Sequence, residues 1–332
     1  MTPASRKTQE TLRRFGQHVP LKTLARYLIQ RQTELYLNKS GLPDVELARS
    51  LLRYWAGKQG EKNREKAKNK SNYRSDYKMP PPMSAVRTPY KLPEELWLVL
   101  SDIHVPFHSI HSLEVAFDYA KVQGVSGILL NGDFQDCQAV SYFHVARRDF
   151  PMEVELTIDM LDFIRNEFPE IPILWKPGNH EDRLAIYYSS YAPQLSDLPT
   201  SNLETILGLE QRNIVFLDRK QKIMAGKLPI LHGHELRGGS NSVSPARWLF
   251  LKAKGNAMCG HFHRPSTHRE ATINHKNIVT WTTGCLCTLE PDYNPEANNW
   301  SHGFALVHVE KGGGFDVENL EILQNGRVVG VH

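Results

Sequence analysis

Five short apolar runs, each followed at once by side chains that bind metal ions, constrain this chain more than any other feature. In order, the clusters that end the runs are Asp102-Ile103-His104, Gly132-Asp133, Gly178-Asn179-His180-Glu181, His232-Gly233-His234 and Gly260-His261-Phe262-His263. Short apolar runs bounded by polar residues are typical of buried strands. Because α/β folds collect their ligand sites at the carboxyl ends of strands, we expect the five clusters to converge.

The residue types in these clusters indicate what they bind. Carboxylate, imidazole and amide groups form a mixed set of donors that suits Mn²⁺, iron or Zn²⁺. A single Asp-x-His or His-x-His carries little information, since such spacings also occur at surfaces and in cores. Five clusters in succession, each behind an apolar run, predict a centre for two metal ions.

The segments between and after the runs indicate the fold class. Residues 111–122 and 153–167 are helix-like, and the second has an apolar stripe on one side. Segments 271–289 and 303–322 contain stretches in which apolar and polar residues alternate, as they do in strands. Strands that alternate with helices before a more purely β portion predict a layered α/β body.

In their order and spacing, the five clusters resemble the motifs of the calcineurin-like metallophosphoesterase superfamily: D-x-H, G-D, G-N-H-E/D, a histidine after a strand, and G-H-x-H. The resemblance covers roughly residues 96–310. It implies an α/β fold, a four-layer α/β/β/α sandwich of two mixed sheets with the site at one end. The spellings GNHEDR, HGHE and GHFHRP, followed by Trp300-x-x-Gly-Phe304, look like metallophosphoesterases encoded by bacteriophages and prophages.

The resemblance also implies a ligand set for two divalent metal ions, with manganese favoured and iron or zinc as alternatives. One ion would be held by Asp102, His104 and His263, the second by Asn179, His232 and His261, and Asp133 would bridge the two. His234 is a rival of His232 for the fourth motif. As the second histidine after the strand, His234 is expected nearby, among the substrate-binding residues.

The superfamily's chemistry implies roles for residues beside the ligands. In it, a hydroxide that bridges the metal ions attacks phosphorus, because the ions lower the pKa of bound water from 15.7 to about 7. His180 would donate a proton to the leaving oxygen. Asp136 would orient His180, or act only as a turn residue. Arg183 would hold a substrate phosphate, or form a surface salt bridge. Cys137 and Gln138 stand where protein Ser/Thr phosphatases have Arg-Gly, which disfavours a protein phosphatase.

Charge is distributed unevenly along the chain. Residues 1–95 carry 20 Lys or Arg against nine Asp or Glu, whereas the remaining residues carry 20 against 27. A basic arm on an acidic body predicts contact with a polyanion, most often nucleic acid. The alternative is a solvated, weakly ordered leader.

Three zones follow from periodicity and composition. Residues 1–57 predict a basic helical module, either a helix-turn-helix-like DNA-binding element or a dimerisation or docking element. Residues 58–94, rich in Lys, Arg and Pro, are predicted to be a linker. Residues 95–332 are predicted to be the catalytic domain.

Several classes of protein are disfavoured. No run approaches the ~18 apolar residues of a membrane helix, so no membrane contact is expected. The first residues lack the apolar segment of a secretory signal, and four cysteines do not make a disulfide framework. We therefore expect a reduced, cytoplasmic setting, which is the host cytoplasm if the protein is phage-encoded. The oligomeric state is left open.

Together these patterns predict a binuclear-metal-dependent phosphoesterase, with a phosphodiesterase acting on nucleic acid, a nuclease, as the favoured form. The basic arm would supply affinity for the nucleic acid. The first alternative is a phosphomonoesterase acting on a nucleotide or a protein, because the same metal core serves both chemistries. The second is a DNA-binding or assembly protein whose metal site is secondary.

Overall fold

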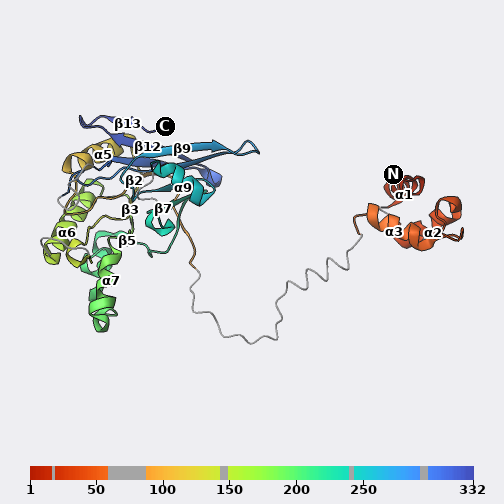
Figure 1. Cartoon of the computed structure of the whole chain (residues 1–332), viewed down its shortest axis with the longest axis horizontal. Helices are drawn as coiled ribbons and strands as arrows, with labels where there is room; N and C mark the ends of the chain where they lie inside the picture. The colour runs from red at the N-terminus through yellow and green to blue at the C-terminus, as the bar shows by residue number, and fades with distance from the viewer. Residues whose placement is uncertain (17–18, 59–86, 143–148, 239–242, 292–297) are drawn as a thin grey trace. The chain divides into compact units, whose positions relative to one another are not determined.

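The structure, a computed structural model, describes residues 1–16, 19–58, 87–142, 149–238, 243–291 and 298–332. The chain divides into two units, residues 1–84 and 85–332 (Figure 1). Most of the predicted linker, residues 58–94, lies outside the described residues. Each unit has an apolar core of its own.

The N-terminal unit is built from helices that pack around one small core. Leu24 and Leu28 of the second helix meet Ala48 and Leu52 of the third, and all four side chains are buried. These positions lie on the apolar faces that the periodicity of the two segments predicts. The helices are α1 (Pro3–Phe15), α2 (Leu21–Arg31) and α3 (Val45–Trp55).

The connections between these helices are longer than the three or four residues of a helix-turn-helix. Residues 16–20 join α1 to α2, and residues 32–44 join α2 to α3. Asp44 ends the second connection and caps α3, because its carboxylate accepts a hydrogen bond from the backbone N–H of Leu47 (2.9 Å). The described part of this unit is therefore a helical bundle with long connections.

The larger sheet of the C-terminal unit is mixed, and its seven described strands run in the order β13-β12-β11-β2-β3-β4-β5. Strands β2 to β5 are parallel to one another, whereas β11 is antiparallel to both β2 and β12. The bounds are β2 (Leu96–Leu100), β3 (Gly127–Asn131), β4 (Ile173–Lys176), β5 (Ile214–Phe216), β11 (Gly303–Val309), β12 (Phe315–Ile322) and β13 (Val328–Gly330).

The smaller sheet is also mixed, and its described strands follow the order β1-β6-β7-β8-β10-β9. Strands β7, β8 and β10 are parallel, and β9 and β6 are antiparallel to their partners β10 and β7. The bounds are β1 (Tyr90–Lys91), β6 (Ile223–Ala225), β7 (Leu228–Leu231), β8 (Ala257–Cys259), β9 (Ser266–Ala271) and β10 (Asn277–Thr282).

Helices cover the outer faces of both sheets, which confirms the predicted α/β/β/α sandwich (Figure 1). Along β2, Leu98 and Leu100 face the helices, whereas Trp97 and Val99 face the other sheet. Helices α5 and α6 pack on the larger sheet, and α9 packs on the smaller one. Among the described residues, no helix is long and apolar enough to cross a membrane. The helix bounds are α5 (Ile110–Gln123), α6 (Phe150–Glu167), α7 (Asp182–Tyr191), α8 (Leu203–Ile206) and α9 (Pro245–Ala253).

The C-terminal unit includes residues that precede the predicted boundary at residue 95. Backbone N–H groups of Tyr90 and Leu92 donate to the carbonyls of Lys222 and Met224 (2.8 and 2.9 Å), and this pairing forms β1. Leu92 is buried in the core between the two sheets. The nearby prolines conceal this strand in the sequence, because a two-residue strand carries no periodicity of its own.

Candidate metal centre

The five predicted clusters lie at the carboxyl ends of strands from both sheets. In the larger sheet, neighbouring strands β2, β3 and β4 lead into the loops that carry Asp102, Asp133 and Asn179. In the smaller sheet, neighbouring strands β7 and β8 lead into the loops that carry His232 and His261. Parallel neighbours end at the same edge of a sheet, so this topology brings distant segments of the sequence together.

Asp102 and Asp133 contact imidazoles from both sheets. Oδ1 of Asp102 lies 3.3 Å from Nε2 of His263 and 3.9 Å from Nε2 of His232. Oδ2 of Asp133 lies 3.0 Å from the same nitrogen of His232. His104 joins this cluster, because its Nε2 lies 3.2 Å from Nε2 of His263.

Asp133 belongs to two groups of potential ligands. The first group is Asp102, His104 and Asp133, and the second is Asp133, His232 and His261. Within each group, one ligand atom of each residue lies within 4.8 Å of a ligand atom of the other two. A further group contains Cys287, whose Sγ lies 4.0 Å from Nδ1 of His263. Sequence reasoning gave Cys287 no role in the centre.

Several buried atoms of these loops lack the hydrogen bonds that buried polar atoms normally make. Within the described part of the chain, Oδ1 of Asp102, Oδ1 of Asn179 and Nε2 of His232 make no hydrogen bond of normal geometry, although the first and the last lie close to charged groups of the cluster. The other ring nitrogen of His232 bonds to the backbone oxygen of Asn131 (2.8 Å). That bond fixes the ring and directs Nε2 toward the two carboxylates, where Nε2 would give its electron pair to a metal ion after losing its proton. The donor set therefore fits divalent metal ions.

The electrostatics of the cluster favour positive charge. Burial opposes charge on His232, but Asp133 and Asp102 outweigh it and raise the pKa of this imidazole to about 10. Burial opposes charge on His263 as well, and Asp102 raises the pKa of His263 to about 10. Burial and the neighbouring His232 instead lower the pKa of His261 to about 4. The carboxylates thus hold protons on two imidazoles, and metal ions would supply the same positive charge.

The backbone of the cluster is strained at five positions. Non-glycine residues rarely adopt the left-handed conformation, which costs each of them about 1 kcal/mol or more. The left-handed residues of the cluster are Asp102 (φ 58°), His104 (φ 53°), Asp133 (φ 52°), His261 (φ 69°) and His263 (φ 56°). Such outliers concentrate at functional sites, and these five are all predicted ligands.

Glycines that precede the ligands are required by close packing. A Cβ atom added to Gly132 would overlap the ring of His232, and one added to Gly178 would overlap the carboxylate of Asp133. The glycines of the Gly-Asp and Gly-Asn-His motifs therefore let the loops of neighbouring strands approach each other. This close approach brings the ligand side chains to one point.

Asp136 lies between two imidazoles. Its Oδ2 is 2.9 Å from Nδ1 of His104 and 3.2 Å from Nδ1 of His180. Nη1 of Arg183 donates to Oδ1 of Asp136 (3.0 Å), and Nη2 of Arg183 lies 3.0 Å from Nε2 of His180. Burial opposes charge on Asp136, but the two imidazoles outweigh it and hold the pKa of this carboxyl well below its usual range. Asp136 is thus positioned to orient both rings.

His234 lies beside the cluster. The centroid of its ring is 5.4 Å from that of His232 and 6.4 Å from that of His261. Its Nδ1 is buried and makes no hydrogen bond to any residue that the structure describes. His232 therefore contacts the two central carboxylates, and His234 is its neighbour.

Glu181, between β4 and α7, supports the cluster, a role that sequence reasoning missed. Its buried carboxylate accepts hydrogen bonds from the backbone N–H groups of Asp133, Phe134, Gln135 and Gly178, over 2.7 to 3.1 Å. Burial and the nearby Asp133 raise the pKa of Glu181 to about 7. The carboxylate thereby ties the loop after β3 to the loop after β4. Its position next to His180 was the only signal in the sequence.

Three further residues were missed. The buried Lys176 forms an ion pair with the partly exposed Glu235 of the other sheet's loop, and the lone charged residue in the apolar run ILWK was the available signal. The ring of Trp300 packs edge-on against His263, with centroids 4.1 Å apart. These residues hold the ligand loops in place through contacts that are distant in sequence.

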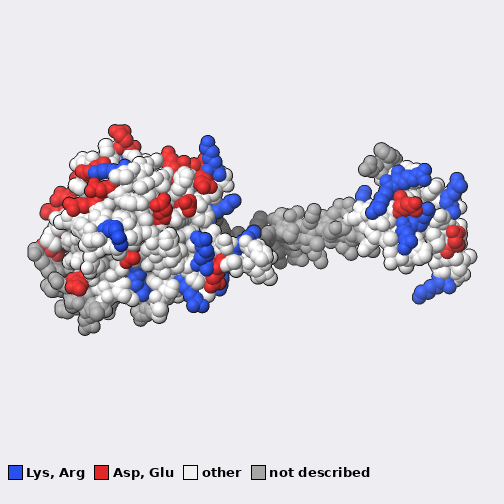
Figure 2. Space-filling model, turned by 90° about the horizontal axis from the view of Figure 1, so that it is seen from above, with Lys and Arg blue, Asp and Glu red and all other residues white. Residues whose placement is uncertain are grey.

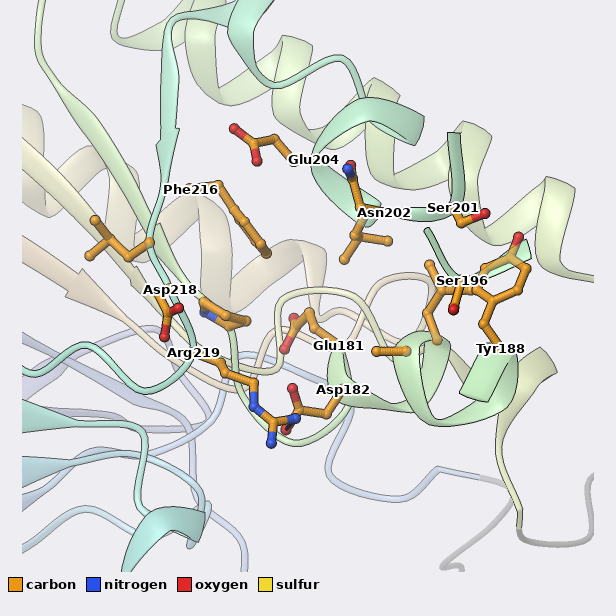
Figure 3. A pocket seen from close by; sticks show the side chains of 15 residues that line it. Glu181, Asp182, Tyr188, Ser196, Ser201, Asn202, Glu204, Phe216, Asp218 and Arg219 are labelled. Atoms are coloured by element: carbon orange, nitrogen blue, oxygen red, sulfur yellow. Dashed lines mark ion pairs between the residues drawn. The ribbon is translucent and has the colours of Figure 1, made fainter. Parts of the chain in front are cut away.

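A cavity of about 500 Å³ lies beside the loop that carries Asn179 (Figure 3). Asp182 and Arg219 point toward each other across part of it and form an ion pair (3.0 Å). Its charged lining in the described residues consists of four carboxylates and one guanidinium, namely Glu181, Asp182, Glu204, Asp218 and Arg219. Such a lining repels an anionic phosphate, so the candidate site for a phosphoester is the strand-end cluster.

Comparisons with known proteins identify one family. The profile of the calcineurin-like phosphoesterases matches residues 97–302. Among solved structures, Vps29 from Chaetomium thermophilum shares 15% identity over 70% of this chain and 94% of its own, with a TM-score of 0.36. YfcE, a phosphoesterase from E. coli, shares 14% identity over 71% of this chain and 100% of its own, with a TM-score of 0.33. No curated protein matches the chain.

Proposed function

The chain belongs to the calcineurin-like phosphoesterase family, and on that premise we propose that it is a metal-dependent phosphodiesterase that cleaves nucleic acid. The observation that carries the catalytic part is the convergence of two carboxylates with unpartnered oxygen and nitrogen donors at one buried point. The observation that carries the choice of substrate is the excess of positive charge in residues 1–95.

The proposed ligands are the members of the two groups that share Asp133, together with His263, which contacts Asp102, and Asn179, whose buried Oδ1 has no hydrogen-bond partner in the described residues. One ion would be held by Asp102, His104 and His263, the other by Asn179, His232 and His261, and both by Asp133. Three oxygen donors and four imidazoles form a mixed set that accepts Mn²⁺, iron or Zn²⁺, and we propose manganese with the other two as alternatives. When bound, the ions would polarise the phosphoryl group and lower the pKa of water.

His180 is proposed as the proton donor to the leaving oxygen. Its Nδ1 is engaged by Asp136, and its Nε2 lies 3.0 Å from Nη2 of Arg183, so Nε2 would face the substrate once that guanidinium turns to a phosphate oxygen. Burial opposes charge on His180, but Asp133 and Asp136 outweigh it and raise the pKa of this imidazole. The ring can therefore carry the proton that a departing alkoxide needs.

Arg183 is proposed to contact the substrate beside His180. Its guanidinium is already oriented by Asp136, and its Nη2 lies at the nitrogen of His180 that would face the leaving group. A fixed guanidinium can bind two phosphate oxygens at once. His234, next to His232, is proposed as a second contact to the substrate.

A substrate panel tests the proposal. The full chain is incubated with single-stranded DNA, duplex DNA, RNA, bis(p-nitrophenyl) phosphate, p-nitrophenyl phosphate and a phosphopeptide, each with Mn²⁺, Fe²⁺, Zn²⁺ or a chelator. We expect cleavage of nucleic acid and of the diester with Mn²⁺, and no cleavage with chelator. Cleavage of DNA should also fall steeply with salt, because affinity for the phosphate backbone comes from counterion release.

Two variants make the panel decisive. Asp133→Asn should abolish cleavage and weaken the stabilisation of the protein by Mn²⁺, which thermal unfolding measures without a substrate. His308→Ala, an exposed histidine on β11, should change neither. Turnover of the monoester alone would replace the nuclease by a phosphomonoesterase. Absence of turnover with every metal and substrate would contradict the enzymatic proposal.

A further inference from the structure

We propose that the folded N-terminal unit binds the sugar-phosphate backbone of nucleic acid through one basic surface, formed by Arg13, Lys22, Arg49, Arg53 and Lys58. This inference rests on the proposed function, because it assigns the nucleic-acid contact of that function to particular residues. It assigns the contact to these five residues and not to the basic residues that follow Lys58 in the sequence.

Two adjoining hollows define the basic surface. The first, of about 730 Å³, is lined by the end of α1 and the start of α2 and includes Arg13 and Lys58. The second, of about 410 Å³, lies between α2 and α3 and includes Lys22, Arg49 and Arg53. Lys58 lines both hollows, so the five basic side chains occupy one continuous surface.

The charge on this surface is unbalanced. Among the described lining residues of both hollows, Glu46 is the single acidic side chain. Glu46 contacts Arg49, and its Oε2 lies 3.6 Å from Nη2 of Arg53. One carboxylate shared by two guanidinium groups leaves an excess of positive charge. Lys and Arg also outnumber Asp and Glu on the face of the unit that Figure 2 shows.

The composition of the surface favours phosphodiesters over a lipid bilayer. A helix that binds membranes exposes a broad apolar face for insertion. Here the apolar lining residues Leu12, Val19 and Leu21 are half-buried and pack against the core of the unit. Three of the five cations are arginines, whose planar guanidinium matches the geometry of phosphate oxygens.

The choice of partner also follows from the rest of the chain. The C-terminal unit has the fold and family of phosphoester hydrolases, and its residues from 96 onward are acidic overall. An acidic body would repel a nucleic acid, so a separate basic surface is the feature that can offset this repulsion.

The test measures binding without cleavage. A fluorescein-labelled oligonucleotide, single-stranded or duplex, is titrated with the full chain in chelator, and anisotropy is recorded from low to high salt. The variant Lys22→Gln/Arg53→Gln/Lys58→Gln removes three exposed charges of the basic surface. We expect at least tenfold weaker binding at low salt. For the duplex, the slope of log K against log salt should also fall by roughly two to three.

The control variant removes equal charge elsewhere on the same unit. Arg6→Gln/Arg31→Gln/Lys39→Gln changes three exposed residues outside both hollows and should weaken binding less than twofold. Equal losses in the two variants would overturn the proposal in favour of bulk charge. Unchanged binding in the first variant would also overturn it, and would move the contact to other residues.

Two further measurements distinguish this inference from the proposed function. Hydrolysis of bis(p-nitrophenyl) phosphate with Mn²⁺ should be equal in wild type and both variants. Hydrolysis without oligonucleotide binding by the wild type would overturn the basic surface and the nuclease while keeping the phosphoesterase. Oligonucleotide binding that depends on the surface, without any hydrolysis, would keep the surface and overturn the enzyme. Binding to phosphatidylserine vesicles but not to oligonucleotides would assign the surface to membranes and overturn the inference.

Discussion

Nζ of Lys176, the last residue of β4, lies 3.1 Å from Oε1 of Glu235, which follows β7 in the other sheet. Lys176 is almost completely buried and also donates to the backbone carbonyls of Arg219 and Gln221. The second oxygen of Glu235 accepts the N–H of Gly233 (2.7 Å), next to His232. Burial would raise the pKa of Glu235, but Lys176 outweighs it and lowers that pKa to about 2. The pair thus joins the loops after β4 and β7.

Loss of this ion pair should destabilise the fold. Lys176→Met leaves Glu235 without its cation, and breaking a fully buried pair costs about 3–5 kcal/mol. Glu235 keeps some exposure, so we expect about 2–3 kcal/mol in urea unfolding. Lys222→Met, at an exposed lysine, should change the free energy of unfolding by less than about 0.5 kcal/mol. Equal effects of the two substitutions would contradict a structural role for the pair.

The role of His180 should depend on the leaving group. An alkoxide needs a proton as it departs, whereas p-nitrophenolate does not. His180→Asn should therefore lower kcat about 10²–10⁴-fold for a dinucleotide and far less for bis(p-nitrophenyl) phosphate. Steady-state kinetics with both substrates measures the difference. A similar loss with both would mean that His180 positions other groups and donates no proton.

Asp136 should act through His180. Asp136→Asn keeps one oxygen for Arg183 but removes the charge that His180 and His104 contact. We expect kcat for the dinucleotide to fall about tenfold or more, with KM nearly unchanged, because orientation in the transition state is lost. In the His180→Asn background, at saturating Mn²⁺, the same substitution should have little further effect on kcat, and its effect through His104 should show as weaker Mn²⁺ binding. If the two substitutions lowered kcat independently in the double variant, Asp136 would not act through His180.

A methyl group at Gly178 should disturb the centre. The added Cβ would overlap Asp133, so Gly178→Ala should lower the free energy of unfolding and weaken Mn²⁺ binding, measured by calorimetry. Gly255→Ala is the matched control, since the nearest atom to its added Cβ is 3.9 Å away. That substitution should be neutral or stabilise by about 0.4–1 kcal/mol. Unchanged Mn²⁺ affinity in Gly178→Ala would contradict the packing argument.

Glu153 of α6 should make stability depend on pH. Burial raises its pKa from 4.5 to about 7, although the N–H of Ala139 partly opposes the shift. The folded state therefore binds a proton that the unfolded state releases, and the free energy of unfolding falls as pH rises from about 4.5 to 7. Glu153→Gln should reduce this slope and stabilise the protein at pH 8, whereas Glu181, whose pKa is also raised to about 7, should maintain the rest of the slope. The control Glu155→Gln, at an exposed residue of the same helix, should leave the slope unchanged. If Glu153→Gln had the same slope as the wild type, the pH dependence would belong to another group.

Much of the fold could be predicted because its signals are local. The apolar runs that became β2, β3, β4, β7 and β8 each carry their pattern within a few residues, and so do the helices expected at 111–122 and 153–167. The order of the five clusters then placed their side chains at strand ends. The structure brings these side chains together because the neighbouring strands that carry them are parallel. The motifs imply this arrangement only through their resemblance to the family.

Contacts between distant segments could not be predicted in the same way. Lys176 and Glu235 are 59 positions apart, and neither residue carries a mark of its partner in the sequence. Glu181 was visible next to His180, but its bonds to the loop after β3 depend on how two strands align. From the sequence, Arg183 could either hold a substrate phosphate or form a surface salt bridge. The folded loop shows that its guanidinium contacts both Asp136 and His180.

The left-handed backbone at Asp102, His104, Asp133, His261 and His263 has a consequence for how this chain could change over generations. Glycine would relax each of these positions, and the relief of about 1 kcal/mol apiece is comparable to that of many stabilising substitutions. Selection for thermodynamic stability alone would favour glycine at these positions. Imidazoles and carboxylates at all five positions are therefore held at a cost in thermodynamic stability, as expected of side chains that serve the centre and not the fold.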